Sequence, residues 1–273
     1  MAALMLERIG SLLPARPRDA HKGMFGHVLV LGGDLGMPGS VRLSAEGALR
    51  VGAGCVTVGT RALHIAPVVC GRPELMCYGL EKSFGPVLKV LIERASVVVL
   101  GPGLGQSDWS TRCFDAAIKA PCALVIDADG LNALSHQQLK RKNWILTPHP
   151  GEAARLLGCS TAEVQANRLD TVHALVARFG GVVVLKGMHT LIGAQGQAVE
   201  RCDAGNPGMA SPGMGDLLTG IIAGFVAQGI ELFNAAVLGV WIHATAADKV
   251  AERQGERGLL AGDVLSELGS LLT

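Results

Sequence analysis

The chain has 273 residues, enough for one large domain or two small ones. Charged residues make up only 17 % of it and apolar residues 49 %, so most elements should be buried on both sides. The net charge of +1 argues against nucleic acids and membrane surfaces as partners, because both attract proteins through bulk electrostatics. The net charge is still compatible with an anionic small molecule as a ligand, because a single loop can bind such a molecule.

The cysteines and the apolar stretches bear on the cellular compartment. The 7 cysteines form no C-x-x-C pair, which favours free thiols in a reducing cytoplasm over disulfides or a metal site. The first residues lack the long apolar region of a signal peptide. The longest charge-free stretches lie within 217–230 and 232–247, and both are shorter than the ~20 residues of a membrane helix. We therefore expect a cytoplasmic protein.

Short β-branched runs recur along the chain, and each ends in glycine or a polar turn. Their hydrophobicity is nearly continuous rather than alternating, which is typical of parallel strands covered on both faces. The runs occupy residues 27–33, 55–60, 96–103, 123–130, 144–149 and 181–187. Helical patterns occupy 40–52, 108–120 and 160–180; a strand or hairpin arm is indicated at 191–200, and the pattern is helical after residue 213.

The alternation of strands and helices predicts the fold. We expect an α/β protein with three layers, α/β/α, around a mostly parallel central sheet. No shift in composition and no Pro/Ser-rich linker divides the chain. We therefore expect a single domain over residues 21–273, preceded by an N-terminal extension over residues 1–20.

Ligands bind to such sheets at the carboxyl ends of the strands. The unusual segments of this sequence follow the predicted strands, and they read GGDLGMPG, GPGLG, DADGLN, TPHPGE and KGMHT. Because the carboxyl ends of parallel strands share one edge of the sheet, we expect these segments to outline a large cleft.

The segment SPGMGDLLTG places Asp216 between a glycine-rich loop and an apolar run with helical spacing. Asp216 should lie in the first turn or at the cap of this helix, where the amides from Gly213 to Gly215 would form an anion hole. A carboxylate beside a bound phosphate could take a proton from a substrate hydroxyl. Simple N-capping is the alternative. The glycines and the proline before Asp216 favour catalysis, with capping as the way the carboxylate is held.

Two further segments carry candidate ligand contacts. Lys186 follows a buried strand and could reach phosphate oxygens together with Thr190, or it could be a solvated turn lysine. His149 stands between two prolines that fix its backbone, although a lone loop histidine is often only polar surface.

The acidic segment after residue 126 has two interpretations. Asp127 and Asp129, with Asn132, could hold Mg²⁺ or position a nucleotide, or they could form a turn and an N-cap. The glycine-rich segments 32–40 and 101–105 permit close approach of a ligand to the backbone. They do not contain G-x-G-x-x-G in order or a P-loop motif, so a nicotinamide-dependent dehydrogenase and a P-loop enzyme are disfavoured.

These motifs together resemble the ribokinase-like superfamily, in which a G-x-G-D aspartate opens a late helix downstream of a K-G-x-x-T segment. Within it, the chain resembles the ADP-dependent NAD(P)H-hydrate dehydratases. The likeness is carried by HKGMFGHVLVLGG, GPGLG, IDADGLN, TPHPGE, KGMHT and GNPGMASPGMGDLLTG. They occur in this order from residue 21 to residue 220, so the resemblance covers nearly the whole domain.

The resemblance implies a reaction. Members of the family dehydrate the S epimer of hydrated NADH or NADPH (NADHX or NADPHX) at the expense of ADP, and they release AMP and phosphate. Eukaryotic members use ATP instead, and the bacterial character of this chain favours ADP. Mg²⁺ is expected to accompany the ADP, although the sequence does not identify its ligands.

The resemblance also implies roles for single residues. Asp216 would be the base that activates the C6 hydroxyl of the hydrate, beside an anion hole that stabilises the transferring phosphoryl group. The nucleotide would be bound by Lys186, Gly187, Met188, His189, Thr190, Gly213 and Gly215. The hydrate would be bound by Gly47, Gly103, Gly105 and His149, together with Asp216.

The resemblance also bears on the partners of the protein and on rival functions. Many bacterial members follow an epimerase domain that interconverts the two hydrates, so this chain is either a standalone enzyme or the C-terminal half of a bifunctional protein. We expect a homo-oligomer, with a tetramer as one form. The chain shows no separate lid segment, which disfavours a sugar kinase. The rival interpretations are a thiazole or pyridoxine-type kinase of the same fold, and a nucleotide sensor without catalysis.

Overall fold

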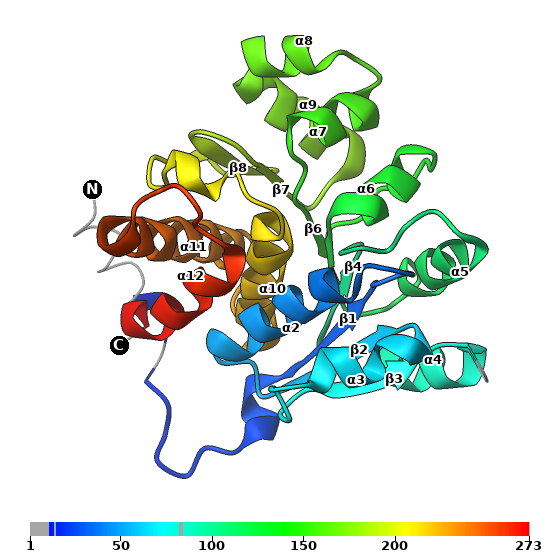
Figure 1. Cartoon of the computed structure of the whole chain (residues 1–273). Helices are drawn as coiled ribbons and strands as arrows, with labels where there is room; N and C mark the ends of the chain where they lie inside the picture. Colours follow the sequence, from blue (N-terminus) through cyan, green and yellow to red (C-terminus); the bar gives the residue numbers. More distant parts are fainter. Residues whose placement is uncertain (1–10, 14, 82–83, 273) are drawn as a thin grey trace.

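The β-branched runs form one sheet. The computed structural model describes residues 11–13, 15–81 and 84–272 of the chain, and Figure 1 shows its trace. Nine strands lie in the order β3-β2-β1-β4-β5-β6-β7-β8-β9. All neighbours from β3 to β7 are parallel, whereas β8 pairs antiparallel with β7 and β9. The strands are β1 (His27–Leu31), β2 (Cys55–Thr60), β3 (Met76–Gly79), β4 (Val97–Leu100), β5 (Ala123–Ile126), β6 (Trp144–Leu146), β7 (Val182–Leu185), β8 (Thr190–Ala194) and β9 (Glu200–Cys202).

Helices cover both faces of the sheet (Figure 1). One face is covered by α2 (Pro38–Arg50), α3 (Ile65–Val69), α10 (Met214–Ala227), α11 (Leu232–Gln254) and α12 (Ala261–Leu268). The other is covered by α4 (Phe84–Arg94), α5 (Asp108–Ala117), α6 (Ala128–Ser135), α7 (Pro150–Leu157), α8 (Thr161–Ala166) and α9 (Arg168–Phe179). In β1, Val28 and Val30 enter the first core while Leu29 and Leu31 enter the second. The predicted α/β/α layers are confirmed.

Several predicted elements differ in extent. The runs at 27–33, 96–103 and 123–130 contain shorter strands, because their glycines and polar residues form the loops that follow. The segment 191–200 belongs to the hairpin of β8 and β9, which extends the main sheet. The prediction of one helix over 160–180 was wrong, because Asn167 has non-helical backbone angles and separates α8 from α9.

The edge strand β3 was not predicted from the sequence. It has four residues, MCYG, of which Met76 and Tyr78 are exposed. A strand at the edge of a sheet is often short and only half-covered. Its hydrophobic run is therefore too short to stand out.

The helix that carries Asp216 packs closely on the first half of the chain. A Cβ atom added to Gly220 of α10 would lie 1.9 Å from the carbonyl oxygen of Ser44 in α2. The Ser44 hydroxyl also donates a hydrogen bond to the carbonyl oxygen of Asp216 at 2.7 Å. The glycine-rich face of α10 thus fixes the height of the Asp216 turn above the sheet.

The predicted N-terminal extension, 1–20, falls partly outside the described residues. Within it, the Arg16 guanidinium donates to the carbonyl oxygen of Gly52 at 2.6 Å and lies 3.8 Å from the ring centre of Phe25. The boundary at residue 21 stays a prediction. In the described part of the chain, every helix is too short or too polar to cross a membrane.

Candidate active site

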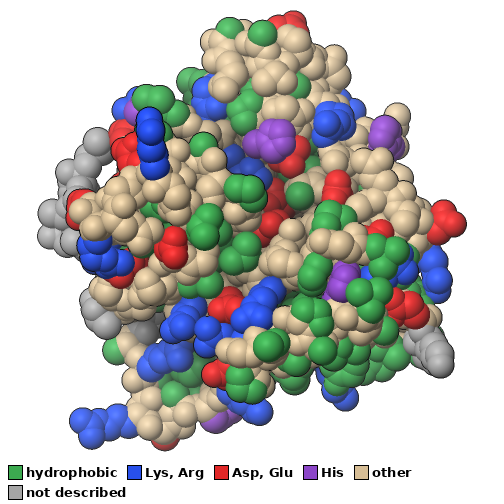
Figure 2. Space-filling view, viewed as in Figure 1, with side chains coloured by type: hydrophobic (Ala, Val, Ile, Leu, Met, Phe, Trp, Pro, Cys, Tyr) green, Lys and Arg blue, Asp and Glu red, His purple; other side chains and the backbone are tan. Residues whose placement is uncertain are grey.

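The loops that follow the parallel strands are tied together at one edge of the sheet. The Gly33 amide donates to Pro102 at 3.0 Å, and the Lys186 amide donates to Pro148 at 2.9 Å. Figure 2 shows acidic, basic and histidine side chains close together in the upper centre, where Figure 1 shows α7 and the first turn of α10. The expected convergence of these segments is therefore present.

Asp127, Lys186 and Thr219 form the buried base of the site. The Lys186 ammonium lies 2.6 Å from Asp127 Oδ1, and the Thr219 hydroxyl donates to Asp127 Oδ2 at 2.9 Å. Burial raises the pKa of Asp127, but the charge and hydrogen bond of Lys186 outweigh it and lower the pKa. Burial lowers the pKa of Lys186, yet the carboxylates of Asp127 and Glu152 raise it overall. Both groups are therefore charged at neutral pH.

Glu152 joins this base to His149. Pro150 occupies the first turn of α7, and the His149 ring caps the helix by accepting from the Gly151 amide through Nδ1 at 3.0 Å. Glu152 accepts from the His149 amide at 2.7 Å, and its carboxylate lies 3.5 Å from His149 Nε2 and 3.7 Å from Lys186 Nζ. Burial raises the pKa of Glu152 to about 7. Burial, followed by the charge of Lys186, lowers the pKa of His149.

Asp216 lies in the first turn of α10 and does not cap it. The helix begins at Met214, its N-cap is Gly213 with φ 88°, and no side chain caps it. The predicted role of capping in holding this carboxylate was therefore wrong; the first turn of the helix backbone positions it, and Ser40 is close enough to lower its pKa. Burial and then the negative charge of Asp127 raise the pKa of Asp216 to about 6. A carboxylate with this pKa is ionised at neutral pH and accepts a proton more readily than an exposed one.

Two glycines shape the space around this turn. A Cβ atom on Gly213 would lie 2.4 Å from Leu43, and one on Gly215 would lie 3.2 Å from Lys186 Nζ and 3.4 Å from Asp127 Oδ2. The first amides of α10 have no partner within the helix, so they can bind an anion beside Lys186. The structure brings Gly213, Gly215, Lys186 and Asp216 together.

The rest of the predicted nucleotide segment forms the turn between β7 and β8. Gly187 and His189 have φ values of 122° and 54°. The Thr190 hydroxyl donates to the Gly187 carbonyl at 2.9 Å, and His189 Nδ1 lies 2.8 Å from Asp203. Met188 is 82 % exposed. Lys186 thus points into the buried base, while the turn after it is open to solvent.

The glycines of the loop after β4 lie against the loop after β1. Gly103 and Gly105 have φ values of 55° and 71°. The Asp34 amide donates to Gly103 at 2.7 Å, and the Gly105 amide donates to Asp129 Oδ2 at 2.8 Å. Both glycines therefore line the strand edge near α6.

Gly47 occupies a different place from these glycines. A Cβ atom on Gly47 would lie 2.9 Å from both Cδ1 and the carbonyl oxygen of Leu217. It lies in the contact between α2 and α10, so close helix packing accounts for this residue without a ligand.

The acidic segment after β5 is bonded to protein groups. Asp127 is bonded to Lys186 and Thr219, and Asp129 accepts from Gly105 and Asn132. Among the residues that the structure describes, no three His, Cys, Asp or Glu side chains could share a metal ion.

An ion pair that was not predicted from the sequence lies beside the glycine loops. Arg61 Nε lies 2.7 Å from Asp34 Oδ1, and the Ser107 hydroxyl donates to Asp34 Oδ2 at 2.6 Å. Burial raises the pKa of Asp34, but hydrogen bonds from Ser107 and Arg61 lower it overall. Thr219 was also missed, although its place one turn after Gly215 could have indicated it.

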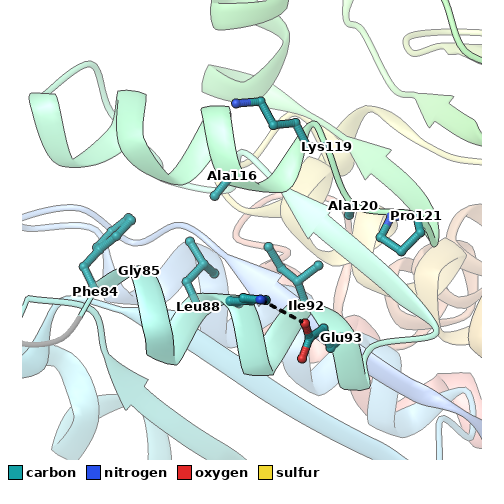
Figure 3. A pocket seen from close by; sticks show the side chains of 10 residues that line it. Phe84, Gly85, Leu88, Ile92, Glu93, Ala116, Lys119, Ala120 and Pro121 are labelled. Atoms are coloured by element: carbon teal, nitrogen blue, oxygen red, sulfur yellow. Dashed lines mark ion pairs between the residues drawn. The ribbon is translucent and has the colours of Figure 1, made fainter.

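A groove elsewhere on the molecule is separate from this site. It has a volume of about 320 Å³ and lies between α4 and α5, and Figure 3 shows Phe84, Leu88 and Ile92 along it. The ion pair of Lys89 and Glu93 lies at its side. It shares no residue with the strand-end site.

Known proteins are similar to this chain in sequence and in fold. A family model described as NAD(P)H-hydrate dehydratase matches residues 28–269. The bifunctional NAD(P)H-hydrate repair enzyme of Coxiella burnetii is 54 % identical over 96 % of this chain and 53 % of its own length. The ADP-dependent (S)-NAD(P)H-hydrate dehydratase of Neisseria meningitidis is 40 % identical over 94 % of this chain and 88 % of its own.

A solved structure of a protein named as a dehydratase is also similar to this chain. The ADP/ATP-dependent NAD(P)H-hydrate dehydratase of Bacillus subtilis, co-crystallised with ATP and Mg²⁺, superposes with a TM-score of 0.85 at 29 % identity, over 97 % of this chain and 95 % of its own. This chain spans about half the length of the bifunctional relatives it matches.

Proposed function

Because the chain belongs to the NAD(P)H-hydrate dehydratase family, we propose that it dehydrates the S epimer of NADHX or NADPHX at the expense of ADP. The products are NADH or NADPH, AMP and phosphate. The observation that carries this proposal is the half-buried Asp216 carboxylate, whose raised pKa of about 6 suits a base, in the helix turn that faces Lys186.

Two chemical steps account for the reaction. In the first, the C6 hydroxyl of the hydrate gives its proton to Asp216 while its oxygen bonds to the β-phosphorus of ADP. The bond from that phosphorus to the bridging oxygen breaks, and AMP leaves. In the second, the C6–O bond breaks and phosphate leaves with the electron pair. The proton lost from C5 departs with the phosphate, and the C5=C6 double bond of the dihydronicotinamide is restored.

The chain's own residues supply charge and orientation for the first step. Lys186 and the first amides of α10 stabilise negative charge on the transferring phosphoryl group. Asp127 and Glu152 hold the Lys186 ammonium from below. The hydrate site is lined by His149, Gly103 and Gly105. The nucleotide contacts the turn from Gly187 to Thr190. Gly47 acts through the packing of α10 in this proposal.

Cofactor and partners follow from the same proposal. ADP is the phosphoryl donor, and a Mg²⁺ ion that accompanies it would neutralise phosphate charge and be held by phosphates and water. An epimerase, fused or separate, would supply the S hydrate from the R hydrate. A homo-oligomer stays a prediction.

The direct test incubates the full chain with NADHX and ADP and follows NADH absorbance, AMP and phosphate. We expect all three to appear in equal amounts. Phosphorylation of a thiazole or pyridoxine alcohol without recovery of NADH would identify a kinase instead. Nucleotide binding without any turnover would identify a sensor.

Asp216→Asn tests the base. Asparagine keeps the size but cannot take the proton, so turnover should fall by roughly 10²–10⁴-fold while ADP affinity changes little. The matched control is Asp170→Asn, in the exposed first turn of α9, which should leave turnover unchanged. An active Asp216→Asn enzyme would refute the assignment.

A further inference from the structure

A cavity of about 530 Å³ adjoins the candidate active site. It lies between α6 on one side and α5 with the loop before it on the other, and Arg155 of α7 lines one wall. Gly105 and Asp129 form part of its lining and are joined by the hydrogen bond at 2.8 Å. Because both residues also border the strand-end site, a ligand too long for that site can continue into the cavity.

Charges on the cavity wall act on the active site. The pKa of Asp216 is raised by burial and Asp127 first, and then by the carboxylate of Asp129. Burial and Lys186 lower the pKa of His149, and Arg155 adds to this effect. Asp129 and Arg155 therefore lie within electrostatic range of the base and of the histidine.

The lining of the cavity suits a nucleoside. Its floor is the buried part of the lining, formed by Leu104, Phe114 and Ser110 with the half-buried Ala133, and it is mostly apolar. Its rim carries hydrogen-bonding side chains, namely Gln106, Asp115, His136 and Gln137. An apolar floor with a few polar groups, in a volume within roughly 300–1,000 Å³, is typical of small-molecule sites. A purine can lie on the floor, and ribose hydroxyls can reach the rim.

Arg155 is held at the boundary between the cavity and the site. Its guanidinium donates to Asn132 Oδ1, and Asn132 Nδ2 donates to Asp129 Oδ1 at 3.0 Å. The Arg155 side chain is otherwise exposed. A guanidinium fixed in this way presents donors in the geometry that phosphate oxygens prefer.

We propose that this cavity binds the adenosine half of the hydrated dinucleotide, with Arg155 against its pyrophosphate and the hydrated nicotinamide ring at Asp216. The inference rests on the proposed function. It assigns substrate recognition to α5, α6 and Arg155, on the side of the site away from the turn that would contact ADP.

The test compares two substrates on the wild-type enzyme with ADP present: NADHX, and the hydrated reduced nicotinamide mononucleotide, which lacks the adenosine half. Remote binding groups contribute to kcat/KM, so loss of this half should lower kcat/KM on the order of 100-fold. Ala133→Trp fills the cavity and should reduce kcat/KM for NADHX to the value for the shorter substrate. It should leave the shorter substrate unaffected.

The control is Ala116→Trp, which adds the same bulk in the groove between α4 and α5 and should leave both values unchanged. Ala133→Leu repeats the test with a smaller side chain and a proportionally smaller loss. Equal wild-type kcat/KM for the two substrates, or equal losses for both in Ala133→Trp, would overturn the cavity assignment while the dehydratase function stands. Absence of wild-type turnover on both would instead refute the proposed function.

Discussion

At the scale of single residues, Glu152 joins the side of the site that we propose for the hydrate to the side that we propose for the phosphate. It contacts His149 through the helix cap and Lys186 through charge. The capping-box role alone would be met by any acceptor at the third helical position. Its burial beside another carboxylate gives it a second property, a pKa of about 7 instead of 4.5.

Glu152→Gln should change how stability depends on pH. The folded chain keeps the Glu152 proton up to about pH 7, whereas the unfolded chain loses it near 4.5. This group's stabilising contribution is therefore full below pH 4.5 and is lost as pH rises through 7. Glutamine does not titrate but can still accept from the His149 amide. Relative to wild type, the variant should gain roughly 2 kcal/mol in free energy of unfolding between pH 5 and pH 8.

Urea unfolding at each pH measures this gain. Glu163→Gln is the control, because Glu163 occupies the same capping-box position in α8 but is exposed. Parallel pH profiles for wild type and Glu152→Gln would show that Glu152 titrates normally.

The buried pair of Asp127 and Lys186 supports a prediction on stability. Lys186→Met leaves the Asp127 carboxylate buried with only hydroxyl partners, and breaking such a pair costs about 3–5 kcal/mol. Adding Asp127→Asn removes the uncompensated charge and should recover most of the loss. A double-mutant cycle in urea measures the coupling between the two. Additive losses would mean that the pair contributes nothing as a pair.

At the scale of elements, the position of α10 depends on α2. Gly47 and Gly220 let the two helices approach until backbone meets backbone. The sequence shows where these glycines are but not what they do. A glycine that allows two helices to pack closely and a glycine that lines a ligand site can have the same spacing. The sequence also did not decide whether α10 begins at Met214, with Asp216 in its first turn, or begins after Asp216, with Asp216 as its N-cap.

Gly47→Ala distinguishes the two roles of this glycine. The new methyl group would meet Leu217 at 2.9 Å and push α10 away, so we expect a loss of roughly 1–3 kcal/mol in stability with a lower kcat. Gly39→Ala, in the same helix with open space around it, should be neutral or stabilising by up to about 1 kcal/mol. Thermal unfolding and steady-state kinetics measure both. A higher KM with unchanged stability in Gly47→Ala would place Gly47 at the substrate.

Strands and helices differ in how well the sequence predicts them. The buried parallel strands were predictable because each is part of a short, nearly continuous apolar run that ends in glycine or a polar turn. β3 was not, since an edge strand needs few apolar residues. The break at Asn167 was also hidden, because the apolar spacing continues through it and only the backbone angles mark it.

At the scale of the whole molecule, the convergence of the strand-end loops was predictable from the parallel sheet alone. Because ligands bind at the carboxyl ends of parallel strands, the sequence alone indicated the region of Asp127, His149 and Lys186. It could not predict which carboxylate pairs with Lys186, because that depends on side-chain packing across the edge. Arg61 and Thr219 were missed for the same reason, since each acts through a partner distant in sequence.

The contact between α2 and the Asp216 turn also bears on how the protein folds. Ser44 and Asp216 are 172 residues apart in the chain, and contacts of such separation form late because a long loop must close first. On the ribosome, the sheet strands from β1 to β7 emerge before α10 does. Until α10 emerges, the growing polypeptide has only α2 and α3 on that face of the sheet, and the turn that carries Asp216 is not yet present.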